Sequence, residues 1–404
     1  MKSPRETSRR DFLLAASAAG LVALVRSARS LAWRGESRLE GDLLYVGTYT
    51  EGGRRDGIYL IRMDPRSGKL RQVGSVDAGA NPSFLAMHPN GRVLYAVSEV
   101  GTHNGKPAGA VSAFAIASAT GALARLGDQS SGGAGPCFVS VDRTGRVVFV
   151  ANYDGGSVAL LPIQADGALA PATQVVQHEG RGPNAERQSA PHAHCIRADA
   201  SNRFALAADL GADRVFVYRL DVDSKSLRHI EGGDAVMHPG AGPRHITFHP
   251  TLPLVYVANE LDSTVATLRF DAERGALSPL DIRSTLPRGW TGANYPADIH
   301  VAPSGRTLYV SNRGHNSIAV FSVAKSTGAL TLEQVISTEG DWPRNFSLDP
   351  SGRWLLVANQ RSNSVVVFSR DEETGRLTST RQRIALPSPV CLRFRARYNP
   401  AAGA

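Results

Sequence analysis

Short apolar runs bounded by Gly, Pro, Asn or Asp recur along most of the chain, and segments with helical spacing are scarce. The stretch 241–260 shows the pattern well. It contains a strand of alternating apolar residues, a turn at residues 249–253, and a second strand that ends in Asn259-Glu260. Because two antiparallel strands joined by one turn return to the same end, Arg244 at the start of the first strand should lie near Glu260. The stretch therefore predicts a hairpin with an Arg and a Glu at its open end.

This hairpin pattern occurs several times in the chain. Six copies align on their turn residue without a gap, and each second strand ends ten and eleven residues after it. The turn residues are His88, Asp142, Asp199, His249, Ala302 and Asp349. They lie 54, 57, 50, 53 and 47 residues apart, so the length varies only outside the hairpin. A period of this size, built from strands, indicates a β-propeller.

Each repeat continues with a second pair of strands, in most copies joined by a Gly-x-Leu turn such as Gly275-Ala-Leu277. A seventh unit is divided between the two ends of the chain, because residues 44–49 and 57–70 lack an innermost strand and residues 389–394 have its pattern. We therefore expect an all-β, seven-bladed β-propeller with four antiparallel strands per blade, closed by the C-terminal strand completing the first blade. Such closure removes an exposed sheet edge.

The N-terminal residues have a different character. Ser8-Arg-Arg-Asp-Phe-Leu13 is a twin-arginine signature, and it is followed by an apolar run and by the small-residue sequence Ser30-Leu31-Ala32. We interpret residues 1–32 as a twin-arginine export signal, 33–41 as a linker, 42–396 as the propeller and 397–404 as a tail. The expected location is periplasmic or secreted. The alternative interpretation of residues 1–32 is an N-terminal anchor that is not cleaved, or a pair of arginines that occurs by chance.

Composition and charge are those of an ordinary globular protein, with 42% hydrophobic and 20% charged residues. Residues 1–32 carry six basic and two acidic side chains, so their removal lowers the formal net charge from +9 to +5. With no lysine-rich run or basic helix, we expect no nucleic-acid partner. We also expect no membrane contact after signal cleavage, and a monomer. Three cysteines cannot all pair, and we expect them to be free and buried.

The alignment predicts which side chains share one rim of the propeller channel. In each blade the innermost strand starts, and the second strand ends, at that rim. Counting from the turn places Ala193 level with the proline of other blades and His194 level with Arg244, which leaves His192 in the incoming loop. The ionisable residues expected at or near the rim are Glu99, His192, His194, Arg244, His245, Glu260, Asp298, Arg313 and Arg344.

Crowding so many ionisable groups into a narrow funnel is costly unless they are paired or used, which favours a functional site. Arg suits an anionic ligand because its planar fork grips a carboxylate or phosphate through two hydrogen bonds. A calcium site formed by the carboxylates is conceivable, but the interleaved arginines would repel the cation, so we expect no metal and no cofactor. Arg344 and Glu99 could equally be partners in ion pairs between blades.

Other recurring residues have structural explanations. The Asn that ends each second strand is interpreted as a turn residue whose amide satisfies the backbone. His88 and His249 occupy turn positions where other blades carry Asp, so hydrogen-bonded turn histidines are expected. Cys195 lies where other blades have Phe, which favours a packing role over a nucleophile.

Several motifs, in order and at matching spacing, resemble one known family over residues 42–396. They include Pro-His-Ala-His194, Gly-Pro-Arg244-His245-Ile-Thr-Phe-His-Pro, Val-Ala-Asn-Glu260, Ala-Asp298-Ile-His and Val-Ser-Asn-Arg313-Gly. The chain resembles the seven-bladed lactonases, the family of propeller-type 6-phosphogluconolactonases and of the fungal carboxymuconate cyclase. The resemblance implies metal-free lactone chemistry with His194, Glu260, Arg244 and Arg313 as the catalytic residues. His192, His245, Asp298, Arg344 and Glu99 are then the expected substrate-binding residues.

The leading hypothesis is a hydrolase of the 6-phosphogluconolactonase type that opens a sugar-type or related anionic lactone, with Glu260 or His194 as general base. Two alternatives stay open. A lactonising cycloisomerase would use the same Arg-rich funnel in the opposite chemical direction, and a non-catalytic binding propeller would use its outer loops. The export signal leaves the substrate open, because a sugar phosphate lactone is a cytoplasmic metabolite.

Overall fold

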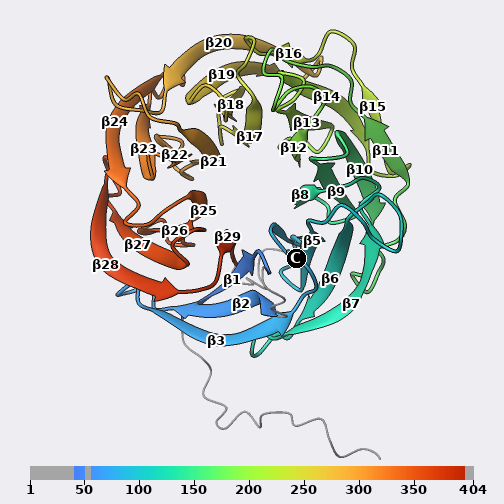
Figure 1. Ribbon diagram of the computed structural model, residues 1–404, viewed down its shortest axis with the longest axis horizontal. Helices are drawn as coiled ribbons and strands as arrows, with labels where there is room; N and C mark the ends of the chain where they lie inside the picture. The colour runs from blue at the N-terminus through green and yellow to red at the C-terminus, as the bar shows by residue number, and fades with distance from the viewer. Residues whose placement is uncertain (1–40, 51–55, 396–404) are drawn as a thin grey trace, which may run out of the picture. The chain divides into compact units, whose positions relative to one another are not determined.

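A computed structural model describes residues 41–50 and 56–395, and within them the chain forms seven antiparallel sheets. The sheets are arranged in a ring, with the innermost strands such as β12 (Ala193–Ala198) toward the centre and the outermost such as β3 (Leu70–Asp77) at the rim (Figure 1). The seven-bladed propeller expected from the repeat is confirmed. No helix in this described part is long and apolar enough to cross a membrane.

The blades follow one another in chain order, except that the C-terminal strand belongs to blade 1. Blade 1 contains β29 (Pro389–Phe394), β1 (Asp42–Thr48), β2 (Asp56–Met63) and β3. Blade 2 contains β4 (Leu85–Met87), β5 (Val93–Ser98), β6 (Ala110–Ile116) and β7 (Leu123–Ser130). Blade 3 contains β8 (Pro136–Val141), β9 (Val147–Asn152), β10 (Ser157–Pro162) and β11 (Gln174–Gln177).

The other four blades complete the ring. Blade 4 contains β12, β13 (Phe204–Asp209), β14 (Arg214–Asp221), β15 (Ser226–His229) and the short β16 (Ala235–Val236). Blade 5 contains β17 (Pro243–Phe248), β18 (Leu254–Asn259), β19 (Thr264–Asp271) and β20 (Ala276–Ser284). Blade 6 contains β21 (Tyr295–Val301), β22 (Thr307–Arg313), β23 (Ser317–Val323) and β24 (Leu330–Ser337). Blade 7 contains β25 (Pro343–Leu348), β26 (Trp354–Asn359), β27 (Ser364–Arg370) and β28 (Leu377–Ala385).

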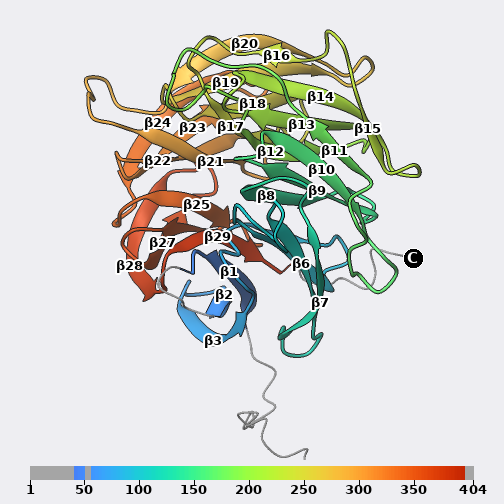
Figure 2. The ribbon, with the colours of Figure 1, turned by 45° about the vertical axis from the view of Figure 1, so that its right-hand side comes forward.

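The C-terminal strand closes the ring as predicted. β29 pairs antiparallel with β1, with Leu44 opposite Phe394 and Val46 opposite Leu392. Figure 2 shows the red β29 beside the blue β1 at the join between the first and last blades. The backbone N–H of Leu392 also donates to the side-chain oxygen of Asn345 in blade 7, at 2.7 Å. The closing strand is therefore held on both sides.

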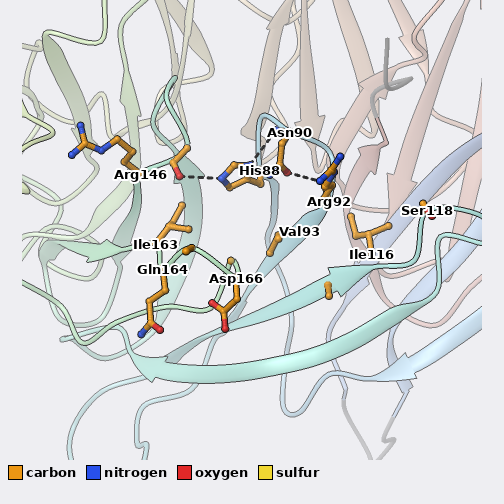
Figure 3. A pocket seen from close by; sticks show the side chains of 14 residues that line it. His88, Asn90, Arg92, Val93, Ile116, Ser118, Arg146, Ile163, Gln164 and Asp166 are labelled. Atoms are coloured by element: carbon orange, nitrogen blue, oxygen red, sulfur yellow. Dashed lines mark hydrogen bonds between the residues drawn. The ribbon is translucent and has the colours of Figure 1, made fainter. Parts of the chain in front are cut away.

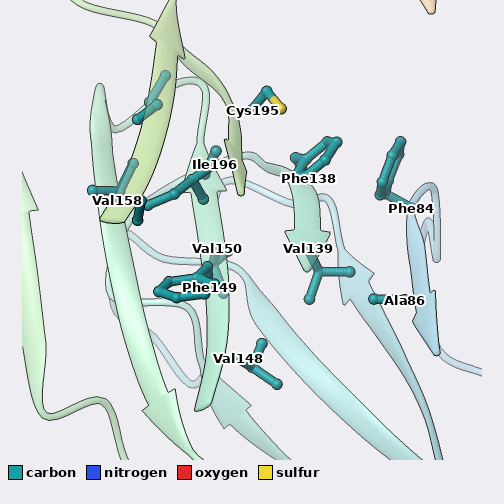
Figure 4. Close-up of a cluster of buried hydrophobic side chains, with 14 of the residues drawn as sticks. Phe84, Ala86, Phe138, Val139, Val148, Phe149, Val150, Val158, Cys195 and Ile196 are labelled. Carbon is teal, nitrogen blue, oxygen red and sulfur yellow. The ribbon is translucent and has the colours of Figure 1, made fainter. Parts of the chain in front are cut away.

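The hydrophobic core lies between neighbouring blades. The second strands β9, β13 and β18 are buried at every position, because both faces of a blade pack against other blades, whereas β11 alternates between partly buried and exposed residues. Nearer the axis, Phe84, Phe138 and Cys195 extend from adjacent innermost chain segments (Figure 4), and the two phenyl rings lie 4.3 Å apart. Cys137, Cys195 and Cys391 are free and buried, as expected.

In several blades a tyrosine of the second strand is hydrogen-bonded to the Gly-x-Leu turn of the following blade. The hydroxyl of Tyr256 donates to the carbonyl of Gly328 in the next blade, at 2.8 Å. Gly328 has φ +71°, and a Cβ there would lie 2.0 Å from Leu254, so only glycine fits. The equivalent pairs are Tyr45 with Gly121, Tyr95 with Gly167 and Tyr309 with Gly375.

The turn residues also link blades. His88 and His249 each place Nε2 3.0 Å from a carbonyl of the following blade, that of Gly145 and that of Gly305. Nδ1 of His249 accepts from two backbone N–H groups of its own turn, so the expected structural role of these histidines is confirmed. The strand-end Asn residues have the expected role too. The amide of Asn312, for example, donates to the carbonyl of Thr285. Residues 1–40, 51–55 and 396–404 lie outside the described residues, and with them the predicted export signal, most of the predicted linker and the predicted C-terminal tail.

Candidate active site

In several blades a β-bulge near the start of the innermost strand places a side chain at or just behind the site. In blade 4, Ala193 pairs with Asp209 and Cys195 with Ala208, so His194 is an extra residue between two registers. The same shift leaves Cys137, Arg244 and Arg344 unpaired in their own blades. A bulge frees a side chain from the ladder and changes its direction. The alignment of His194 with Arg244, made from the turn residue, is thereby confirmed.

The ends of the second strands supply the other side chains. Glu99 and Glu260 follow β5 and β18, and Arg313 is the last residue of β22. Together with the bulge residues Cys137, His194 and Arg344 they surround a cavity of about 330 Å³. Its lining residues are Tyr49, Glu99, Cys137, Tyr153, Asp154, Arg187, His194, Glu260, Arg313 and Arg344. Five of the nine predicted site residues therefore meet in one cavity: Glu99, His194, Glu260, Arg313 and Arg344.

Three arginines converge on Glu260, which is 3% exposed. Its Oε1 accepts from Arg187 at 2.6 Å, and its Oε2 accepts from Arg313 at 2.6 Å. Nε of Arg244 lies 3.0 Å from Oε2, in an ion pair whose N–H does not point at the oxygen as a hydrogen bond would require. Burial alone would raise the pKa of this carboxyl, but the three guanidinium charges hold the pKa of Glu260 far below its usual value. The carboxylate is thus always ionised and a weak base.

His194 is buried among cations. Its Nδ1 lies 3.5 Å from Sγ of Cys137, and its ring packs edge-on against Tyr153 and His245. Burial, and then the charge of Arg244, lowers the pKa of His194 well below the ordinary 6.5. The imidazole is therefore neutral at physiological pH, the form that can accept a proton.

Arg313 and Arg344 line the cavity from neighbouring blades. Arg313 donates through Nε to the carbonyl of Tyr295 at 3.0 Å, and this second contact fixes its plane. Burial lowers the pKa of Arg313 to about 9, with Glu260 opposing that effect, so it stays charged at neutral pH. Arg344 lies over the ring of Tyr49 and 3.9 Å from Glu99. Glu99 accepts from the hydroxyl of Tyr49, at 2.9 Å, and from that of Ser83, so this acid is bound mainly by hydroxyl groups.

The family model described as "Lactonase, 7-bladed beta-propeller" matches residues 43–394. The chain belongs to the seven-bladed β-propeller lactonase family. A relative from Bacillus subtilis named 6-phosphogluconolactonase is 38% identical over 350 residues, which cover 87% of this chain and 97% of the relative.

Solved structures agree with this lactonase assignment. A periplasmic gluconolactonase from Pseudomonas aeruginosa has a TM-score of 0.82 and 35% identity, with 88% of this chain and 99% of that chain covered. A putative 6-phosphogluconolactonase from Bacteroides fragilis has a TM-score of 0.81 and 35% identity, with coverage of 89% and 99%. The family resemblance and the lactonase class expected from the sequence are confirmed.

Three other predicted site residues lie behind the cavity of this lactonase. Arg244, 2% exposed, donates to the carbonyl of Ala297 at 2.5 Å and lies 3.1 Å from Nε2 of His245. Nδ1 of His245 donates to Asp298 at 2.9 Å, which makes Nε2 the acceptor for Arg244. Burial lowers the pKa of His245 to about 3, so the ring stays neutral. These hydrogen bonds, from Asp298 through His245, orient Arg244 against Glu260.

Asp298 connects these hydrogen bonds to β29, the strand that closes the propeller. It accepts from His300 at 2.9 Å and from Asn345, whose oxygen accepts from the closing strand. His192 also lies outside the cavity lining. It stacks on Tyr153 with ring centroids 4.4 Å apart, and its Nδ1 lies 2.9 Å from the carbonyl of the same residue. His192 and His245 thus contact the lining side chains Tyr153 and His194, and Asp298 lies one residue further from the cavity, against His245.

The sequence analysis did not select Arg187, although it contacts Glu260 directly. Arg187 lies in the loop between β11 and β12, outside the repeat, so alignment of the blades carries no information about it. Tyr49 and Tyr153 hold the position of Glu260 in their own blades, and Cys137 holds the position of Arg244. They were not selected because their side chains are not typical ligands for an ion. Selecting residues by their position in the repeat, and not by their type, would have found these three.

A larger cavity of about 790 Å³ lies at the opposite, turn end of blades 2 and 3 (Figure 3). Its lining includes His88, Arg92, Arg146 and Asp166. His88 is engaged by the next blade and Arg146 pairs with Asp223 at 2.6 Å, so these groups already have partners. A similar groove lies between the turns of blades 6 and 7, which marks a repeated gap between blades. The smaller cavity, with its convergent charges, is the better candidate for chemistry.

Proposed function

We propose that this lactonase hydrolyses a sugar-type or related anionic lactone in the 330 Å³ cavity, at one mouth of the propeller channel. The observation that carries the proposal is the convergence of neutral His194, Glu260 and Arg313 on that cavity. A proton acceptor and fixed cations beside one another suit a reaction in which water attacks a carbonyl and negative charge develops on its oxygen.

The charge balance supports an anionic substrate. Four arginines, Arg187, Arg244, Arg313 and Arg344, surround two buried or partly buried acids, Glu99 and Glu260. Asp298, a further buried acid, lies behind Arg244 and His245, and Asp154 in the lining is exposed to solvent, so one positive charge is in excess among the buried and partly buried groups around the cavity. Uncompensated buried charge is unfavourable, so an anion entering the cavity would relieve it.

In the proposed mechanism, His194 takes a proton from water as the water oxygen attacks the lactone carbonyl carbon. The oxyanion of the tetrahedral intermediate is held by Arg313, with Arg344 nearby. The bond from the former carbonyl carbon to the ring oxygen then breaks, and the proton on His194 passes to the departing alkoxide. The product is the open hydroxy acid, and His194 returns to its neutral form.

In this scheme Glu260 positions Arg313 and Arg244 instead of acting as the base, because its oxygens are occupied by guanidinium groups. No step passes through a metal ion, since arginines and hydroxyls already surround the two carboxylates. Activity should therefore survive dialysis against EDTA.

Two related proteins suggest the substrate range. The Bacillus subtilis relative is named a 6-phosphogluconolactonase, and the Pseudomonas aeruginosa structure is described as a periplasmic gluconolactonase. We propose an aldonolactone, phosphorylated or bearing another anionic group, as the substrate class. With the twin-arginine signature, the periplasmic neighbour also supports a periplasmic or secreted location, in which we expect the protein to act as a monomer.

The test is a panel of sugar and aromatic lactones followed by pH-stat, with His194→Ala and Glu260→Gln beside the parent. Each substitution should lower turnover by roughly a hundred to ten thousandfold, the range of a general base, while the propeller stays folded. His229→Ala, at a partly exposed histidine paired with Asp234, is the control. Parent rates in both variants would remove the assignment, and turnover of an unsaturated dicarboxylate would indicate the lactonising reaction instead.

A further inference from the structure

Arg187 is the one of the three guanidinium groups at Glu260 that comes from a loop. The loop joins β11 to β12 and is not part of the blade repeat. Arg187 donates to Oε1 of Glu260 at 2.6 Å and to the hydroxyl of Tyr153 at 3.2 Å. Its side chain is 35% exposed, against 6% for Arg313 and 2% for Arg244. Arg187 is therefore the partner of Glu260 that solvent or a ligand reaches most easily.

Both ends of this loop are held by Asp209. At one end Nδ1 of His178 donates to Oδ2 at 2.7 Å, with both side chains fully buried, and at the other the backbone N–H of His192 donates to Oδ1 at 2.7 Å. Next to Arg187, the buried Gln188 donates to the carbonyl of Leu210 at 2.9 Å and to Asp213 at 2.7 Å. The backbone is thus held close to Arg187, and any movement is that of the long side chain.

The two oxygens of Glu260 therefore differ in how firmly their arginine partners are held. Oε2 is held by Arg313 and Arg244, which are buried and have further partners. Oε1 is covered by Arg187. If Arg187 turned toward a bound anion, Glu260 would keep two guanidinium partners, so the movement would leave no buried charge unpaired. The incoming anion would take the place of Oε1 as the acceptor for Arg187, and the guanidinium fork could bind it through two hydrogen bonds where the carboxylate now accepts one.

We propose that Arg187 is the specificity-determining residue of the cavity. It binds an anionic substituent, a phosphate ester or a carboxylate, remote from the lactone carbonyl, and it leaves Oε1 of Glu260 when it does so. This inference rests on the proposed lactone hydrolysis and names the substrate feature that the site selects. It is a substrate contact, because Arg187 lines the same cavity as His194 and Arg313.

The test compares kcat/KM for three lactones: D-glucono-1,5-lactone, its 6-phosphate, and D-glucaro-1,4-lactone, which carries a carboxylate. Arg187→Met keeps much of the side-chain length and removes the charge. We expect the ratio of kcat/KM for an anionic lactone to that for the neutral lactone to fall about 10- to 150-fold, the range for a charged hydrogen bond. The anionic lactone whose ratio falls identifies the preferred group. Arg187→Lys should restore part of the ratio, because it keeps a charge without the fork.

Arg181→Met is the matched control, since Arg181 is an exposed arginine of the same loop and does not line the cavity. Its ratios should equal those of the parent. Ratios within about threefold of the parent for both anionic lactones in Arg187→Met would overturn the inference while leaving lactone hydrolysis intact. If the parent opens none of the three, the proposed function fails. Titration calorimetry with inorganic phosphate then decides the role of Arg187, with binding less than tenfold weaker in Arg187→Met counting against it.

Discussion

Replacing Glu260 with Gln removes the carboxylate on which three guanidinium groups converge, while the shape of the side chain is kept. Arg187 is 35% exposed and can turn to solvent. Arg244 and Arg313, at 2% and 6%, cannot do so without moving the strands that carry them. The substitution thus leaves two buried positive charges without their counter-charge, and the amide oxygen can accept from only part of this donor set.

Breaking a buried ion pair by removing one partner costs about 3–5 kcal/mol. Unfolding entropy of about 2.1 cal/mol/K per residue over roughly 350 residues amounts to about 0.7 kcal/mol/K. The expected fall in Tm for Glu260→Gln is therefore about 4–7 °C. A matched exposed pair gives the control. Arg146 and Asp223 are also 2.6 Å apart, but their side chains are 49% and 87% exposed, so Asp223→Asn should cost less than about 1 kcal/mol.

The assay is thermal unfolding of parent, Glu260→Gln and Asp223→Asn with increasing low-millimolar sulfate. An anion that binds the vacated cluster stabilises only the folded state, by about 2.7 kcal/mol at a hundred times its Kd, which corresponds to about 4 °C here. Sulfate should thus raise the Tm of Glu260→Gln well beyond its effect on Asp223→Asn. Equal Tm values for the two variants, or equal responses to sulfate, would show that the arginines do not depend on Glu260.

The remaining predictions concern pH and closure. His194 and His245 are neutral when folded, and burial lowers the pKa of His245 to about 3, so below pH 6.5 the unfolded chain binds protons that the folded chain does not. These two histidines should therefore lower the free energy of unfolding between pH 6.5 and 4 by up to about 2.7 kcal/mol per pH unit, and His245→Gln should remove about half of that contribution. Urea unfolding at several pH values measures the slope, and identical slopes in parent and His245→Gln would contradict the assignment. Truncation before Pro389 removes β29 and exposes the edge of β1, so the product should aggregate; a soluble monomer with the parent's Tm would show that closure is unimportant.

The sequence alone determined the architecture and the residues that meet at one rim of the channel, which start the innermost strands or end the second strands. Hydrophobic alternation is a local property of each strand, and the constant distance from a turn such as His249 to a strand end such as Glu260 is preserved in every hairpin. The same count placed His194, and not His192, level with Arg244, which the bulged register confirms. Closure by residues 389–394 followed from the missing innermost strand.

Only the tertiary structure decided which of these rim residues line the cavity. The bulges turn His194 and Arg344 toward it, whereas Arg244, His245 and Asp298 are covered by neighbouring blades and form the support beneath Glu260. Arg187 reaches Glu260 from a loop between blades, and no repeat predicts where a loop passes. The physical reason is that strand pattern depends on neighbours along the chain, while burial and charge pairing at the rim depend on seven blades meeting at once.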